Sequence, residues 1–203
     1  MFGVPKTTEI RKSVPKKMLY TKYASELKGD KKTQFDNDIS RIVITNEISP
    51  ASVNIKNGTT VNAIFVVQID LKVKEYNTRD IVLISRLFGQ NLLLVLKYEE
   101  EYQLAIYQTK MLCSEWKNET DIDLNLNGLD LDSVWENLVS QVSGIVAEQG
   151  NSLDEQIAIE GEKTKIKKQI EDLDKKSRRE TQAKKKFEMF QQIKELQKKL
   201  EGM

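Results

Sequence analysis

The chain has 203 residues, of which 39% are hydrophobic and 31% are charged, proportions typical of one globular domain with a polar helical extension. It has no histidine and one cysteine, Cys113, which excludes disulfide frameworks, zinc sites built from cysteine and histidine, and relays between a nucleophile and a histidine. No apolar run reaches the roughly 18 to 20 residues of a membrane-spanning helix, and no signal peptide follows Met1. We therefore predict a cytoplasmic protein without a cofactor.

Charge is unevenly distributed along the chain. Residues 1–32 carry a net charge of +6, residues 33–151 of −8 and residues 152–203 of +3. We predict a basic N-terminal arm packed on the body over residues 1–32, an α+β domain over 33–150 and a charged helical hairpin or coiled coil over 151–203. A polyanion would then meet the two ends of the chain rather than the acidic body.

The arm contains Pro5 and Pro15, which fix the backbone angle φ and disfavour a long helix, so we expect an extended segment. Asn57-Gly58, flanked by β-branched residues, predicts a tight β-hairpin. The apolar runs at 63–73 and 92–96 predict buried strands, and the helical pattern at 79–88 between them favours a parallel crossover. An alternating strand at 102–107 and a helix at 133–143 complete an α+β fold in which helices flank a mixed β-sheet.

The C-terminal region has two apolar stripes with a period near 3.5 residues, separated by a polar gap at residues 175–186. A helical hairpin that turns inside the gap competes with one long helix that dimerises, and the interrupted seam favours the hairpin. Phe187 and Phe190 do not both fit the seam, which predicts a partner-binding surface. Its residues are Phe187, Phe190, Ile193, Leu196 and Leu200.

The polar gap is also strongly basic. Seven basic residues and a single acid, Glu180, lie between residues 175 and 186. Such a hairpin tip could contact nucleic-acid phosphates without reading sequence, or could simply be a solvated loop. The residues concerned are Lys175, Lys176, Arg178, Arg179, Lys184, Lys185 and Lys186.

One pattern points to an enzyme. Asp70-Leu71-Lys72 ends a predicted strand, and restriction-type nucleases use an acid-x-Lys pair on such a strand to hold Mg²⁺ and orient the attacking water. No acid precedes Asp70 on a paired strand after Glu47, so Asp70 and Lys72 remain runner-up catalytic residues and the sequence predicts no metal site.

Several segments resemble a bacterial family known only as a domain of unknown function, and together they cover almost the whole chain. They are Phe2-Gly3-Val4-Pro5-Lys6-Thr7-Thr8-Glu9-Ile10, Val14-Pro15-Lys16-Lys17, residues 35–55 and residues 180–200. The resemblance implies a small accessory protein encoded beside superfamily 2 helicases and DNA methyltransferases, in restriction or antiphage loci. It supplies no catalytic residue.

We therefore expect a non-catalytic accessory or scaffolding subunit of a bacterial DNA-processing or defence assembly. Its partner would be a protein, with a helicase or a methyltransferase as the candidates, bound through the C-terminal helices. The alternatives are a metal-dependent nuclease that uses Asp70 and Lys72, and a stand-alone nucleic-acid-binding module.

Overall fold

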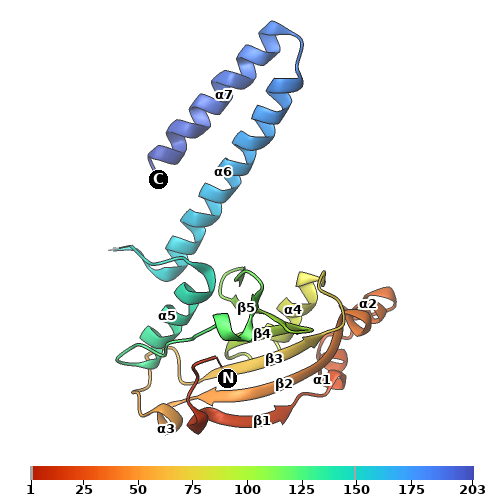
Figure 1. The fold of residues 1–203 in the computed structure, drawn as a ribbon, viewed down its shortest axis with the longest axis vertical. Helices are drawn as coiled ribbons and strands as arrows, with labels where there is room; N and C mark the ends of the chain where they lie inside the picture. The colour runs from red at the N-terminus through yellow and green to blue at the C-terminus, as the bar shows by residue number, and fades with distance from the viewer. Residues whose placement is uncertain (1, 149) are drawn as a thin grey trace. The chain divides into compact units, whose positions relative to one another are not determined.

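The computed structural model describes residues 2–148 and 150–203, and the chain divides into two compact units. The first unit, Met1–Gly144, is called the body below, and the second, Ile145–Met203, the hairpin unit. Figure 1 shows a β-sheet with helices in the body and a pair of long helices in the hairpin unit. No helix in the described part of the chain is long and apolar enough to span a membrane.

The body is built on one mixed, seven-stranded sheet, which confirms the predicted fold class. Six strands lie side by side in chain order, and the seventh, β7, pairs with β5. Among the strands of the described residues, only β3 and β4 pair in parallel, and the other pairs are antiparallel. The strands are β1 (Glu9–Ser13), β2 (Ile39–Ile48), β3 (Ile64–Leu71), β4 (Asn91–Tyr98), β5 (Glu101–Tyr107), β6 (Met111–Cys113) and β7 (Lys117–Asn118).

The parallel pair forms as the sequence predicts. Helix α4 (Thr78–Ser85) connects β3 to β4, and the Asn77 side chain caps it by accepting a hydrogen bond from the backbone N–H of Arg79. Ile81 and Ile84 of α4 are buried in the same apolar cluster as alternate residues of β3 and β4. The crossover therefore packs back onto the two strands that it joins.

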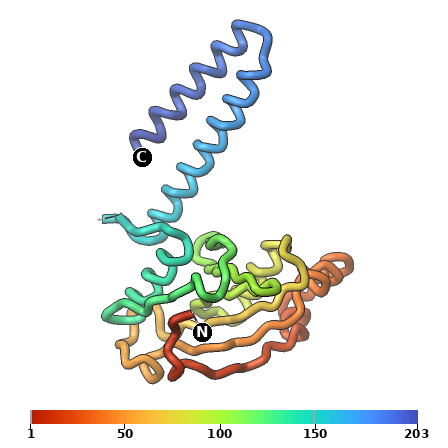
Figure 2. Tube along the Cα trace, in the orientation of Figure 1, coloured from red at the N-terminus to blue at the C-terminus, as the bar shows by residue number. Residues whose placement is uncertain are grey.

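Helices cover both faces of the sheet, as the ribbon and the Cα trace show (Figures 1 and 2). On one face, α1 (Lys16–Lys22) and α2 (Asp30–Asp38) contribute Leu19 and Phe35 to the cluster that also contains α4. On the other face, α5 (Leu131–Ser143) contacts β5 and β6. The remaining short helices are η1 (Lys6–Thr8), α3 (Pro50–Val53) and η2 (Glu119–Asp121).

The N-terminal 32 residues contain more regular structure than an extended arm. Strand β1 is the edge of the sheet, and all five of its residues are exposed. Pro15 directly precedes α1, at a φ of −66° that suits a helix start, and α1 buries Leu19 completely.

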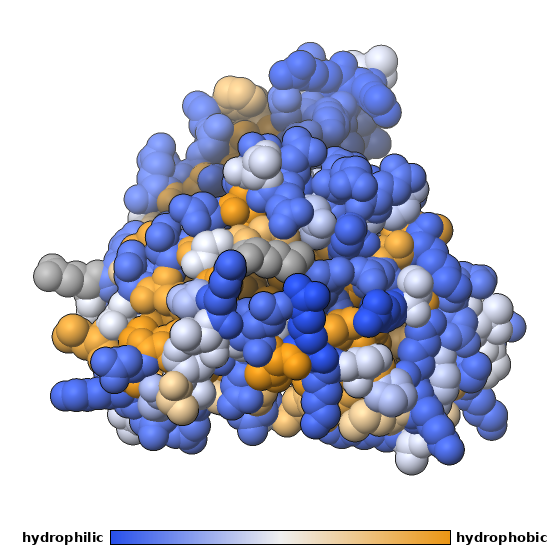
Figure 3. All heavy atoms as spheres, turned by 60° about the horizontal axis from the view of Figure 1, so that its bottom comes forward, coloured by the Kyte–Doolittle hydropathy of each residue, from blue (hydrophilic) through white to orange (hydrophobic). Residues whose placement is uncertain are grey.

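On the face that Figure 3 shows, hydrophilic side chains separate several apolar areas from one another.

The β-hairpin predicted at Asn57-Gly58 is wrong, because a distant carboxylate organises this loop. The Asp132 side chain, in the first turn of α5, accepts hydrogen bonds from the backbone N–H groups of Thr59 (2.5 Å), Thr60 (3.1 Å) and Val61 (2.8 Å). A Cβ atom at Gly58 would lie 2.3 Å from an Asp132 oxygen, so only glycine fits there. A contact across more than 70 positions therefore replaces the local turn.

The hairpin unit consists of α6 (Leu153–Arg179) and α7 (Ala183–Glu201), which pack against each other. Ser152 and Glu155 form a capping box at the start of α6, with the Ser152 N–H donating to Glu155 at 2.7 Å. The turn falls at residues 180–182, inside the polar gap, which confirms the predicted hairpin. Ile166 and Ile193 are buried, one from each helix.

We predict that residues 1–150 fold without the hairpin unit, because the buried strands and helices of the body already form a core. This truncated protein should be soluble and unfold cooperatively in urea, as followed by circular dichroism. Aggregation, or a broad transition without cooperativity, would show that α6 and α7 are part of the core.

The Asp132 contact predicts a pH-dependent loss of stability in Asp132→Asn. Hydrogen bonds from the Thr60 hydroxyl and then from the Val61, Thr59 and Thr60 backbone lower the pKa of Asp132 below its ordinary value of 3.8. A lowered folded-state pKa contributes stability above that value, and the contribution disappears as the pH falls through the folded-state pKa. Asp132→Asn should therefore lower the free energy of unfolding at pH 7, with a smaller difference at pH 3.

Urea denaturation at the two pH values measures both quantities. Glu136→Gln is the matched control, because this exposed side chain lies on the same helix. An equal loss of stability for Asp132→Asn at pH 7 and pH 3 would mean that the carboxylate charge does not hold the loop.

Candidate binding surfaces

The most exposed aromatic side chains of the hairpin unit lie together on α7. Phe187 and Phe190 have 61% and 51% of their surface exposed, and residues three apart are neighbours on a helix. The ammonium of Lys194 lies 5.0 Å from the centre of the Phe190 ring, a cation–π contact that leaves the other ring face open. We call Phe187, Phe190 and Lys194 the aromatic patch.

The other predicted partner-binding residues lie deeper in the pair of helices. Ile193 is buried, whereas Leu196 and Leu200 are half-buried. Leu196 and Leu173 form the apolar part of a groove of about 570 Å³ between α6 and α7. Its remaining lining is polar and carries both signs of charge, with Gln169, Asp172, Lys176, Gln192, Glu195 and Lys199.

The basic residues at the hairpin tip are all exposed, on the last turns of α6 and the first turn of α7. Lys175 and Arg178 pair with Glu171 and Asp174, each four residues earlier on α6, at 2.6 and 2.8 Å. Exposed pairs of this kind are weak, so they leave most of the positive field of the tip available to an anion.

Asp70 and Lys72 have different partners in the fold. The Asp70 carboxylate accepts a hydrogen bond from the Gln68 amide at 2.6 Å, whereas the Lys72 ammonium donates to the backbone carbonyl of Asp36 at 2.8 Å. A nuclease lysine must instead point to the water beside the metal. In the described residues, no group of three or more Asp, Glu, Cys or His side chains is placed to hold a metal ion.

Two other aspartates, Asp38 and Asp80, lie near each other at the start of α4. Asp38 accepts hydrogen bonds from the Gln34 amide (2.6 Å) and the Asn77 backbone N–H (2.9 Å). Asp80 is fully buried and accepts from Arg79 at 2.9 Å, but its second carboxylate oxygen has no partner within the described part of the protein. Burial raises the pKa of Asp80, and the nearby Asp38 carboxylate adds to the rise against the opposing effect of Arg79.

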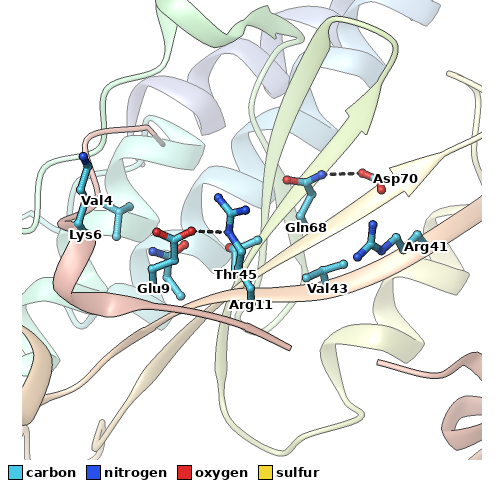
Figure 4. Close-up of a pocket in the computed structure, with 10 residues that line it drawn as sticks. Val4, Lys6, Glu9, Arg11, Arg41, Val43, Thr45, Gln68 and Asp70 are labelled. Carbon is cyan, nitrogen blue, oxygen red and sulfur yellow. Dashed lines mark hydrogen bonds and ion pairs between the residues drawn. The ribbon is translucent and has the colours of Figure 1, made fainter. Parts of the chain in front are cut away.

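A polar cleft of about 430 Å³ lies over β1, β2 and β3, and Figure 4 shows the side chains that line it. Asp70 is one of them, so the predicted acid does face a cavity. Sequence reasoning missed the basic residues of this cleft, Arg11 and Arg41, because their convergence depends on how β1 pairs with β2. The cleft is lined by Val4, Lys6, Glu9, Arg11, Arg41, Val43, Thr45, Asn46, Gln68 and Asp70.

Comparison with known proteins identifies a family but not a function. The family model described as "Domain of unknown function (DUF4391)" matches residues 2–200. Neither a curated protein nor a solved structure matches the chain. Because the family model covers nearly all of the sequence, the chain belongs to the DUF4391 family, whose function is unknown.

Proposed function

We propose that the protein is a non-catalytic accessory subunit that binds a partner protein through its hairpin unit. The aromatic patch is the observation that supports this most directly. Exposed aromatic rings cost free energy in water, and aromatic side chains are enriched among the residues that dominate binding energy at protein interfaces. Phe187 and Phe190 together offer such an anchor on one rigid helix.

The groove between α6 and α7 supports a helical partner segment. Its apolar lining, from Leu173 and Leu196, is narrow and is bordered by acids and lysines, which suits an amphipathic helix with charged flanks. The existing seam is thin, since Ile166 and Ile193 are buried but Leu173, Leu196 and Leu200 are only half-buried. A third helix would remove more of this apolar surface from water.

The class of partner comes from the resemblance of the chain to accessory proteins encoded beside helicases and methyltransferases. We propose a bacterial, cytoplasmic DNA-processing assembly of restriction or antiphage type, with the neighbouring helicase or methyltransferase as the partner. The basic hairpin tip favours an additional, sequence-independent contact with nucleic-acid phosphates. Such a contact would place the hairpin unit beside the DNA on which the assembly acts.

The double substitution Phe187→Ala, Phe190→Ala should weaken binding of the neighbouring helicase or methyltransferase. Removing both anchors should cost at least about thirtyfold in affinity, since loss of one hot-spot side chain costs about 2 kcal/mol or more. Titration calorimetry with the purified partner measures the effect.

Val146→Ala is the control for the aromatic substitutions, because Val146 is a 68% exposed apolar side chain that lies in the same unit but outside both helices. It should bind the partner as the unmodified protein does. Unchanged affinity in the phenylalanine variant would move the interface away from the aromatic patch. Binding of neither candidate partner by the unmodified protein would contradict the assembly that we propose.

The protein should not cleave DNA, because the Asp70 carboxylate binds the Gln68 amide whereas the Lys72 ammonium binds the Asp36 carbonyl. Supercoiled and single-stranded DNA, incubated with the protein in Mg²⁺ or Mn²⁺, should stay intact on a gel. Cleavage that disappears in Asp70→Ala would instead support the nuclease alternative, whereas cleavage that persists in this variant would indicate a contaminant.

A further inference from the structure

We propose that the polar cleft over β1, β2 and β3 binds a nucleotide, with its phosphate between Arg11 and Arg41 and its base toward Asp70 and Gln68. This site is in the body, and the inference does not rest on the partner proposed for the hairpin unit. Figure 4 shows the two guanidinium groups on either side of Val43, and the amide of Gln68 bonded to Asp70.

Irregular strand pairing creates the cleft. Glu9 pairs with Asn46 and Lys12 with Ile44, so β1 has one residue more than β2 over this stretch, which is a β-bulge. Arg11 lies in the bulge with a φ of +45°, a conformation that is unfavourable for residues with a side chain. The bulge places the Arg11 side chain at the cleft together with that of Glu9.

A second irregularity lies beside the cleft on β2. Ile44 pairs with Val67 but Asn46 pairs with Val66, so Thr45 is an additional residue whose hydroxyl donates to the Val66 carbonyl at 3.2 Å. Bulges increase the local twist of a sheet and redirect side chains, and they recur beside functional sites. Two neighbouring bulges at one cavity therefore indicate that the pairing of the strands itself shapes the cavity.

The β1 and β2 side of the cleft, which carries Arg11 and Arg41, suits a phosphate. Arg41 is exposed and stands opposite Asp70 in the strand pairing, yet no ion pair of Arg41 occurs among the described residues. Arg11 forms an ion pair with Glu9, but 79% of its side chain is exposed. Its guanidinium can therefore exchange this weak pair for one with a phosphate. Guanidinium groups bind phosphate oxygens in pairs of parallel hydrogen bonds, and Lys6 adds a third positive charge at the rim.

The β3 side of the cleft, next to Arg41, suits hydrogen-bond donors. The Gln68 amide donates to one oxygen of Asp70, which leaves the Gln68 carbonyl oxygen and the second Asp70 oxygen without partners in the described structure. Both can only accept hydrogen bonds when Asp70 is ionised. The amino and ring N–H groups of a nucleobase are suitable donors, and inorganic phosphate has no such groups.

The remaining properties of the cleft agree with this occupant. Val43, which pairs with Gln68 across β2 and β3, provides apolar surface for a flat ring. The volume of about 430 Å³ lies within the range of about 300 to 1,000 Å³ that is usual for small-molecule sites. A phosphate at one end and donors at the other are both found in a free nucleotide and in one unit of a single strand.

Titration calorimetry with the full chain tests the proposal and separates these two sources. The probes are AMP, GMP, CMP and UMP, inorganic phosphate, and short single-stranded oligonucleotides. At least one mononucleotide or oligonucleotide should bind more tightly than inorganic phosphate, and binding should weaken as salt rises. Binding of mononucleotides indicates a free nucleotide as ligand, whereas binding of oligonucleotides alone indicates a unit of a strand.

Two exposed arginines and one acid of the cleft provide the variants. Arg41→Gln and Arg11→Gln should each lower affinity by about tenfold, as loss of a charge-assisted hydrogen bond predicts. Asp70→Asn should change the order of preference among the four bases, because an NH₂ group, which donates hydrogen bonds, replaces one carboxylate oxygen, which accepts them. Circular dichroism checks that each variant is folded.

Lys28→Gln is the control, since it removes one positive charge from an exposed side chain of the body that does not line the cleft. It should leave affinity unchanged. Absence of nucleotide and oligonucleotide binding at millimolar concentration, or an equal loss of affinity in Lys28→Gln, would overturn the proposal. Insensitivity of binding to both Arg11→Gln and Arg41→Gln would overturn it as well. The Phe187→Ala, Phe190→Ala variant should bind the nucleotide normally, so the two surfaces are tested separately.

Discussion

The body depends on the parallel pairing of β3 and β4. Most residues of these strands are buried, and their alternate side chains enter apolar layers on both faces of the sheet. A parallel pair needs a crossover, and α4 provides one that covers one face of the same strands. β2 and β1 then extend the sheet in one direction and β5 and β6 in the other, so every other strand is positioned by this pair.

The same pair was the most predictable part of the fold. The runs at 63–67 and 92–96 are too continuously apolar to lie on an exposed face, and a helical pattern separates the two strands. The hairpin of α6 and α7 was predictable for a related reason, because a polar gap separates the two apolar stripes. In each case the deciding information lies within the segment itself.

The errors arose where distant residues decide the local structure. Asn57-Gly58 has the composition of a tight turn, but the Asp132 carboxylate binds the following backbone amides and fixes another path. Pro15 precedes a short helix instead of an extended segment, because this helix buries Leu19 in the core. The cleft was unpredictable because a bulge, which the sequence does not reveal, decides where Arg11 points.

Asp80 in the first turn of α4 and Asp132 in the first turn of α5 make the stability of the fold depend on pH in opposite directions. The folded state favours the ionised form of Asp132 but the protonated form of Asp80, whose pKa burial raises. A raised pKa contributes stability that is complete below the unfolded-state pKa and disappears as the pH rises through the folded-state value. Folding therefore releases a proton at one helix and takes up a proton at the other. The stability that these two groups contribute is therefore lost on opposite sides of the interval between their folded-state pKa values, at the start of α5 when the pH falls and at the start of α4 when it rises.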